Sequence, residues 1–263
     1  MIIDTHTHYD DRAFDEDRDE LLLSLSSCGV GIVVDIGVDI ETSQKAIELS
    51  KMYDFIYAVI GFHPSEVKKI PLGDEEKLTD KLREKARDKK NKVVAIGEIG
   101  LDYHWAESKE EREDQKKWFR LQIRLAKELR LPIVVHSRDA ANDTLSIIKE
   151  EKAYECGGVI HCYSYSPELA REYVKMGFYL GIGGVVTFKN SKKLKQTVAE
   201  TDISHLVLET DCPYLSPEPH RGKRNDSKNL IYVIKEIANL KGISEEEVEK
   251  QTEMNARKLY RIP

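Results

Sequence analysis

Residues 92–136 read KVVAIGEIGLDYHWAESKEEREDQKKWFRLQIRLAKELRLPIVVH, and this stretch decides the fold class. It begins and ends with short runs rich in Val and Ile, which are typical of parallel strands buried on both faces. Between these runs, residues 109–130 carry apolar side chains at helical spacing among many charged ones. A strand, a long helix and a second strand in this order predict a parallel βαβ unit.

The same alternation continues along the whole chain. Strands are expected at eight places: Met1–Asp4, Gly31–Gly37, Phe55–Gly61, Lys92–Gly97, Pro132–His136, Gly157–His161, Phe178–Gly183 and His205–Glu209. A helix is expected after each of them: Asp15–Cys28, Ile40–Tyr53, Asp74–Lys89, Lys109–Arg130, Ala140–Glu151, Pro167–Met176, Asn190–Glu200 and Ser227–Leu240. This pattern predicts an α/β protein, a single (β/α)8 TIM barrel that spans residues 1–263 as one domain.

A last helical segment, Ser244–Lys258, follows the eighth unit. It starts with a capping box from Ser244 to Glu247, so we expect an extra C-terminal helix. An open doubly wound sheet would also alternate strands and helices. The number of strands and the length of the chain favour the barrel.

The composition indicates a protein with a sizeable core and a heavily charged surface. Of 263 residues, 40% are hydrophobic and 33% are charged. The four cysteines lack CxxC spacing, so neither a zinc knuckle nor a redox motif is indicated, and reduced thiols are expected. The N-terminus does not resemble a signal peptide, and no apolar run reaches the ~20 residues that a membrane span needs. We therefore expect a cytoplasmic protein without a membrane partner.

Several polar residues fall at or just beyond the carboxyl ends of the predicted strands. They are five of the eight histidines and two acidic residues: His6, His8, His63, His136, His161, Glu98 and Asp211. In a parallel barrel these ends share one rim, where barrel enzymes have their active sites. A lone histidine at a strand end is more often structural, but this many residues on one rim favour a functional set.

Four of the imidazoles and both carboxylates suit two divalent metal ions. In His6-x-His8, alternate residues of an extended segment point the same way, so both rings can reach one ion. The carboxylate of Glu98 can bridge two ions, which a neutral imidazole cannot. Mixed nitrogen and oxygen ligands accept Zn, Mn, Co or Fe, and a carboxylate- and water-rich half accepts Mg, so the identity of the ions stays open. The predicted ligands are His6, His8, Glu98, His136, His161 and Asp211.

The other histidines and a glycine-rich turn are interpreted as structural or peripheral. His205 starts a strand and should lie at the opposite rim, whereas His104 and His220 are placed in loops. His104 is interpreted as a solvated or outer residue, and His220 as a residue within reach of the substrate. Gly181, Gly183 and Gly184 end the seventh strand and are expected to permit a close backbone approach rather than to bind a nucleotide.

Basic residues near the predicted rim point to an anionic substrate. Arg138 follows the fifth strand, and Arg221 opens the run RGKR after the eighth. Such side chains bind phosphates, and a positive rim on a chain of net charge −6 can attract polyanions. The four lysines between residues 189 and 195 are interpreted instead as a solvated helix face. Tyr103 and Trp105 follow the fourth strand and either stack on a base or cap the mouth of the barrel.

Six segments together resemble the TatD family of metal-dependent deoxyribonucleases, within the amidohydrolase-like barrels. They are DTHTH at 4–8, GFHP at 61–64, GEIGLDY at 97–103, HSRDA at 136–140, GVIHCYS at 158–164 and ETDCPYLSPEPHRGKRN at 209–225. The last is the most specific, because a run of that length is hard to match by chance. DTHTH alone indicates only the wider superfamily.

The resemblance implies roles for eight residues of the motifs. One metal ion is held by His6, His8, Glu98 and Asp211, and the second by Glu98, His136 and His161. His63 and Arg138 contact the substrate phosphate. The chain departs from the family in the loop after Asn225 and in the segment CYSYS after residue 161, which affects the shape of the substrate loop and pocket rather than the metal ligands.

The expected reaction is hydrolysis of DNA phosphodiester bonds by a water activated by two metal ions. Glu98 and Asp211 are the predicted catalytic residues, with Asp211 accepting the proton of the water. The resemblance further implies a 3′→5′ exonuclease that acts on single-stranded DNA or 3′ ends.

Two alternatives remain open from the residues. The same activated water would serve hydrolysis of another ester or an amide, such as aminoacyl-tRNA deacylation, with tRNA as the partner. A barrel retained only as a binding protein is the other alternative, but such proteins should lose ligands, and this chain keeps all six.

Overall fold

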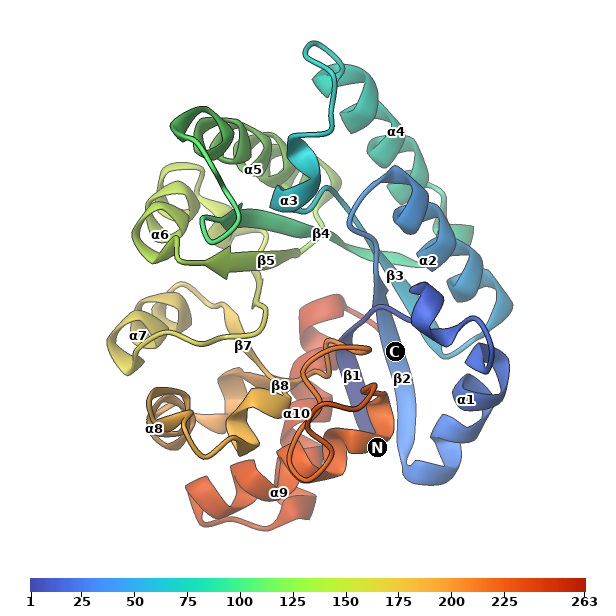
Figure 1. The fold of residues 1–263 in the computed structure, drawn as a ribbon, viewed down its shortest axis with the longest axis vertical. Helices are drawn as coiled ribbons and strands as arrows, with labels where there is room; N and C mark the ends of the chain where they lie inside the picture. The colour runs from blue at the N-terminus through green and yellow to red at the C-terminus, as the bar shows by residue number, and fades with distance from the viewer. The chain divides into compact units, whose positions relative to one another are not determined.

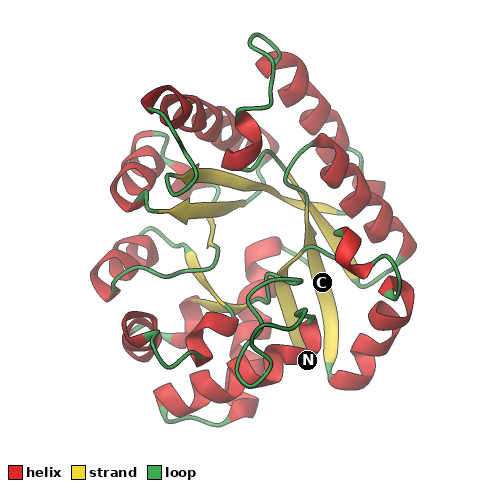
Figure 2. Ribbon diagram, viewed as in Figure 1, coloured by secondary structure: helices red, strands yellow, loops and turns green.

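The computed structural model describes residues 1–263 and contains one eight-stranded sheet in the order β1 to β8 (Figures 1 and 2). The strands are β1 Ile2–Thr7, β2 Val30–Ile36, β3 Ile56–Ile60, β4 Val93–Asp102, β5 Ile133–Arg138, β6 Gly158–Ile160, β7 Tyr179–Ile182 and β8 Leu206–Leu208. The helices are α1 Arg18–Ser24, α2 Ile40–Met52, α3 Pro64–Val67, α4 Glu75–Arg87, α5 Lys109–Leu129, α6 Ala141–Glu150, α7 Pro167–Lys175, α8 Lys192–Glu200, α9 Leu230–Lys241 and α10 Glu245–Tyr260.

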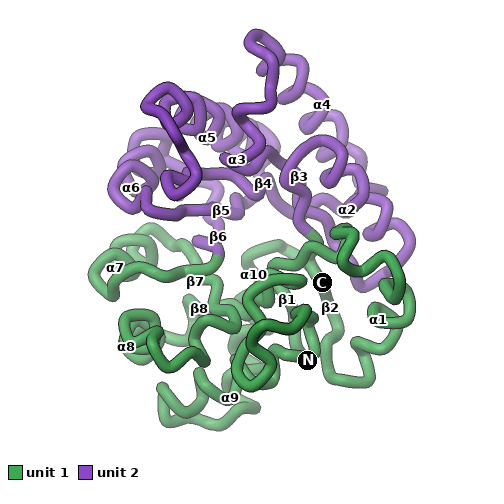
Figure 3. The backbone as a smooth tube through the Cα atoms, viewed as in Figure 1, with its two compact units in different colours: residues 1–35, 162–263 green, residues 36–161 purple.

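The chain divides into two compact units, coloured separately in Figure 3. Unit 1 comprises residues 1–35 and 162–263, and unit 2 comprises residues 36–161. In unit 1 the first strand lies between the second and the last. β1 pairs in parallel with β2, and on its other side Thr7 bridges Cys212 just after β8.

Unit 2 contains the parallel pairs β3–β4, β4–β5 and β5–β6. Its strands are almost free of exposed side chains, as their Val and Ile content requires; Val59, Ile60, Ile96, Val134 and Val135 are all fully buried. Eight strands in chain order, with helices between them and the first strand beside the last, define the (β/α)8 barrel class. The predicted fold class is confirmed, and α10 is the predicted extra C-terminal helix.

Helix ends follow the local chemistry of the sequence. Ser166 accepts a hydrogen bond from Leu169 N–H ahead of Pro167, and α7 begins there. The capping box of α10 is formed by Ser244 and Glu247, as predicted. No helix combines the length and the apolar character that crossing a membrane requires.

Three strands extend further than their apolar runs predicted. β1 continues through Thr7, β4 through Asp102 and β5 through Arg138. His6, Glu98 and His136 therefore lie within strands rather than at or beyond their ends. An apolar run in the sequence shows only which side chains are buried among other apolar groups. The backbone hydrogen bonds of the strand continue beyond it, through residues whose polar side chains face the rim.

Two predicted helices are divided in the structure. The segment 15–28 forms α1 followed by a 3-10 turn at Leu25–Cys28, and α9 is preceded by a 3-10 turn at Ser227–Asn229. The four-residue helix α3 was not predicted, because its apolar residues are too few to show a helical period.

Asn255 ties the C-terminal helix to the start of the last strand. This residue of α10 is 4% exposed, and its amide donates to Ile203 O at 2.8 Å and to Leu206 O at 2.7 Å. We expect Asn255→Ala to lower the free energy of unfolding by about 2 kcal/mol, because two backbone carbonyls lose a donor. Urea unfolding measures the change, with Asn190→Ala, at an exposed position, as the control. A loss no greater than that of the control would contradict the role of the two hydrogen bonds.

Candidate metal centre

In unit 1, His6, His8 and Asp211 converge at the carboxyl end of β1. The Nε2 atoms of His6 and His8 are 3.3 Å apart, and Asp211 Oδ1 lies 3.3 Å from His8 Nε2 and 3.7 Å from His6 Nε2. Two ligand atoms bound to a tetrahedral ion at about 2.0–2.1 Å lie roughly 3.3 Å from each other. The three donor atoms therefore have the spacing of a ligand set, and the two rings share one side of the strand as predicted.

A buried carboxylate, Asp4, holds the two chain segments that carry these residues. Asp4 accepts from the hydroxyls of Ser227 at 2.6 Å and Thr210 at 2.7 Å and from Thr210 N–H at 3.0 Å. Burial raises the pKa of Asp4 to about 7, although these hydrogen bonds act to lower it. Asp4 thus connects β1 to the segment after β8, next to Asp211.

A second buried carboxylate, Asp35 of β2, orders the backbone on both sides of His8. Its Oδ1 accepts from Tyr9 N–H at 2.6 Å and from the Thr7 hydroxyl at 3.1 Å. Burial and the nearby negative charge of Asp10 raise the pKa of Asp35 to about 7. The sequence offered a signal for this residue, since an acidic side chain in the run IVVDIG interrupts an otherwise apolar strand.

In unit 2, Glu98 of β4 is surrounded by three predicted histidines. Its Oε1 lies 2.7 Å from His136 Nδ1, 3.6 Å from His63 Nε2 and 3.9 Å from His161 Nε2. Glu98, His136 and His161 form a group that could hold a metal ion, with ligand atoms within 4.8 Å of one another. His63 is oriented by Ser65, whose N–H donates to His63 Nδ1 at 3.1 Å, so His63 Nε2 faces Glu98.

Asp102, at the end of β4, was not predicted as a site residue. It is 2% exposed, and its Oδ2 lies 3.0 Å from His136 Nε2, on the opposite side of the ring from Glu98. Burial alone would raise the pKa of Asp102, but its interaction with His136 brings it below the ordinary value. Burial likewise acts to lower the pKa of His136, but hydrogen bonds to Asp102 and Glu98 raise it to about 8. The even spacing from Glu98 to Asp102 within a strand, which places both on one face, was the available signal.

The predicted phosphate-binding arginines are both exposed at the surface. In unit 2, the Arg138 guanidinium makes no ion pair and lies 5.8 Å from the centre of the Trp105 ring. In unit 1, Arg221 packs on the Phe188 ring at 4.3 Å. Arg224, from the same basic run, instead pairs with Asp17 through two hydrogen bonds and so anchors its own loop.

The residues interpreted as structural behave accordingly. His205 was predicted to start the eighth strand but ends a 3-10 turn immediately before β8, and its ring lies 6.3 Å from that of Tyr179. A β-carbon at Gly181 would collide with the carboxylate of Glu209, so this glycine permits the predicted close approach. Glu209 is itself 1% exposed and accepts from Cys162 N–H at 2.6 Å, a role that the sequence did not indicate.

Comparisons with known proteins agree with this donor chemistry. The model of the family "TatD related DNase" matches residues 3–261. A metal-dependent hydrolase of Bacillus subtilis, YabD, is 46% identical over 262 residues, covering 100% of both chains. A second such hydrolase, YcfH of Escherichia coli, is 33% identical over 265 residues, covering 100% of this chain and 96% of its own. Both are described as uncharacterized.

Among solved structures, YJJV, a TatD homologue from Escherichia coli, superposes with a TM-score of 0.91. It is 27% identical, and the match covers 100% of this chain and 98% of that one. Family model, relatives and fold agree over nearly the full length. The chain belongs to the TatD family of metal-dependent hydrolases.

Proposed function

We propose that this protein hydrolyses phosphodiester bonds of DNA, acting on single strands or 3′ ends. The observation that carries the proposal is that each unit gathers imidazole and carboxylate donors near the carboxyl ends of its parallel strands. In unit 2, the guanidinium of Arg138, two residues beyond His136 in β5, makes no ion pair. A family model named for deoxyribonucleases supports the choice of substrate.

Both donor sets fit divalent ions in chemistry, and His6, His8 and Asp211 also have the spacing of a ligand set. His6, His8 and Asp211 would hold one ion, and Glu98, His136 and His161 would hold the second; that Glu98 also serves the first ion is what the family resemblance implies. Such ions act as Lewis acids and lower the pKa of a coordinated water toward neutrality. Zn, Mn and Mg are all compatible with these donors.

The other residues bind the substrate and move the proton. The guanidinium groups of Arg138 and Arg221 are both exposed, and each would donate hydrogen bonds to a phosphodiester. Ser65 donates to His63 Nδ1, so in the neutral ring Nε2 carries the proton and can donate to a phosphoryl oxygen. The Asp211 carboxylate accepts the proton that the attacking water loses.

Release of nucleotides from a 3′-labelled single-stranded DNA oligomer tests the proposal. The protein is assayed with added Mg, Mn or Zn, beside His136→Ala. Metal-dependent release that is lost in the variant supports the nuclease. Turnover of a carboxylic or aminoacyl-tRNA ester panel, with none of DNA, would contradict it in favour of a deacylase.

Replacing Asp102 should weaken metal binding without removing a ligand. Asp102 fixes the orientation of His136 from behind, and loss of such an outer carboxylate typically costs about 10–100-fold in metal affinity. We therefore expect the Asp102→Asn variant to release its most weakly bound ion at a chelator concentration about 10–100-fold lower than the unsubstituted protein requires. Metal content measured by mass spectrometry at rising chelator concentration gives the answer. A metal affinity equal to that of the unsubstituted protein would show that packing alone, without Asp102, is enough to orient His136.

A further inference from the structure

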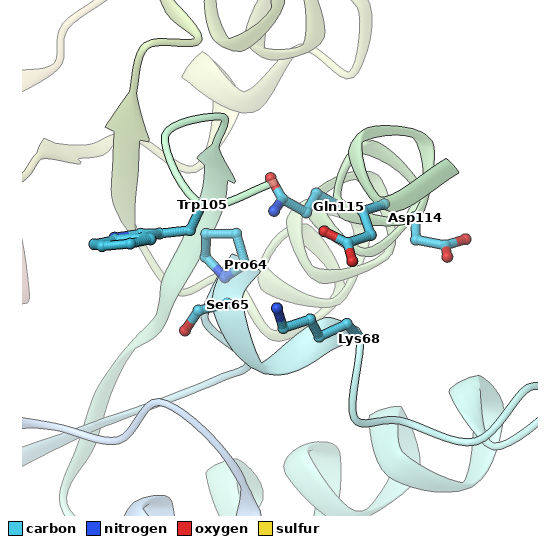
Figure 4. A pocket seen from close by; sticks show the side chains of 7 residues that line it. Pro64, Ser65, Lys68, Trp105, Asp114 and Gln115 are labelled. Atoms are coloured by element: carbon cyan, nitrogen blue, oxygen red, sulfur yellow. The ribbon is translucent and has the colours of Figure 1, made fainter. Parts of the chain in front are cut away.

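A pocket in unit 2 lies next to the residues that we assign to phosphate binding. Figure 4 shows Pro64, Ser65, Lys68, Trp105, Asp114 and Gln115 around it, contributed by α3, the loop after β4, and α5. Its empty space is about 330 Å³, much of which is open to solvent, so the pocket is a shallow surface depression. Pro64 directly follows His63, and the Trp105 ring lies beside Arg138.

The indole ring of Trp105 is largely exposed to solvent, which is unusual for a tryptophan in a folded protein. Its side chain is 60% exposed, whereas Trp118, the other tryptophan, is 4% exposed and packs against Phe62 with ring centres 5.0 Å apart. The residue is nevertheless positioned, because its backbone N–H donates to Asp102 Oδ1 at 3.3 Å and the His104 ring packs edge-on against the indole, with ring centres 4.7 Å apart. A fixed, exposed indole is suited to stacking on a flat ligand.

The polar groups of the pocket can both donate and accept hydrogen bonds. The Lys68 ammonium makes no ion pair and, in Figure 4, points back toward Ser65 and Pro64. Asp114, likewise without an ion pair, and Glu111 offer carboxylate acceptors. Gln115 is a wall of the pocket, because its amide is already bonded to the backbone of Asp102 at 2.9 and 3.1 Å.

We propose that this pocket binds the base of a nucleotide adjacent to the scissile phosphate, with the base stacked on Trp105. The proposal rests on the proposed function, since it places the phosphate at His63 and Arg138. Stacking on an aromatic ring is tolerant of sequence because every base has a π face. The mixture of donor and acceptors in the pocket also accommodates any of the four bases. The subsite therefore provides affinity for single-stranded DNA without sequence preference.

The test compares binding of two single-stranded oligomers that differ only in their bases. One is an ordinary oligomer, and the other carries abasic tetrahydrofuran residues near its 3′ end. Both are titrated onto the metal-chelated protein, so that no cleavage occurs, and affinity is read from the anisotropy of a label. We expect the abasic oligomer to bind about tenfold more weakly to the unsubstituted protein. Trp105→Ala should bind the ordinary oligomer about tenfold more weakly and should no longer distinguish the two.

Two matched variants and a spectroscopic readout complete the experiment. Trp105→Phe retains a ring and should keep part of the discrimination, and Tyr154→Ala removes an exposed aromatic side chain elsewhere in unit 2 and should keep all of it. Because Trp118 is buried, quenching of tryptophan fluorescence by the ordinary oligomer should come from Trp105 and disappear in Trp105→Phe.

The possible results separate the subsite from the hydrolytic function. Equal affinity for both oligomers, or discrimination that survives in Trp105→Ala, would overturn the subsite even if the protein cleaves DNA. Discrimination that depends on Trp105, in a protein that cleaves no phosphodiester with any metal, would sustain the subsite and reject the proposed function.

Discussion

Glu98→Gln is expected to reduce metal-dependent hydrolysis at least about 1,000-fold, which corresponds to roughly 4 kcal/mol of transition-state stabilisation. Glu98 is 3% exposed, and its carboxylate faces His63, His136 and His161. Glutamine has nearly the same shape but lacks the charge and one of the two anionic oxygens. If two ions share this carboxylate, a neutral amide would not replace it, so the variant should bind at least one of the ions more weakly.

The measurement pairs steady-state kinetics with metal content. We expect the variant to retain fewer ions per chain than the unsubstituted protein and to unfold cooperatively. Glu84→Gln removes a charge at an exposed position of α4 and should change neither quantity. Full metal content together with full activity in Glu98→Gln would rule out the bridging role.

The fold could be predicted from the sequence because each strand has a distinctive amino-acid composition. Val- and Ile-rich runs such as VVAIG and PIVVH have few stable alternatives to a doubly buried parallel strand, and the intervening residues have a clear helical period. The positions at which the strands end were harder to predict. β4 continues for five residues beyond the predicted end at Gly97, and these include Glu98 and Asp102.

The candidate ligands were predictable for a related reason. Polar residues that can bind metal are conspicuous where an apolar run ends, and parallel topology gathers such positions on one rim. The sequence did not reveal the supporting carboxylates, which are Asp4, Asp35 and Asp102. They form hydrogen bonds to other protein residues rather than to a ligand, and those residues are distant in sequence. Asp4, for example, bonds to Thr210 and Ser227, a relation that only the folded chain reveals.

Asp211→Asn is expected to lower kcat about 100- to 10,000-fold, the range for loss of a general base. The substitution suits this position because Asp211 has a φ of 58°, and asparagine adopts this left-handed conformation nearly as readily as aspartate. The backbone is also fixed independently of the side chain, since Asp211 N–H donates to His6 O at 2.9 Å and Asp211 O accepts from Tyr214 N–H at 2.9 Å. A loss of activity therefore reports on the carboxylate rather than on the loop.

Two functions of that carboxylate are separated by measuring metal content beside kcat. If the variant keeps its ions and loses turnover, Asp211 acts as the proton acceptor, because an amide oxygen can still bind a cation but cannot take the proton of water. If the ions are lost in proportion to turnover, and excess metal restores the rate, the residue acts as a ligand alone. Full activity with ions bound would remove Asp211 from the chemistry. The His6 and His8 rings, 3.7 and 3.3 Å from its Oδ1, would then be the essential residues of this half of the site.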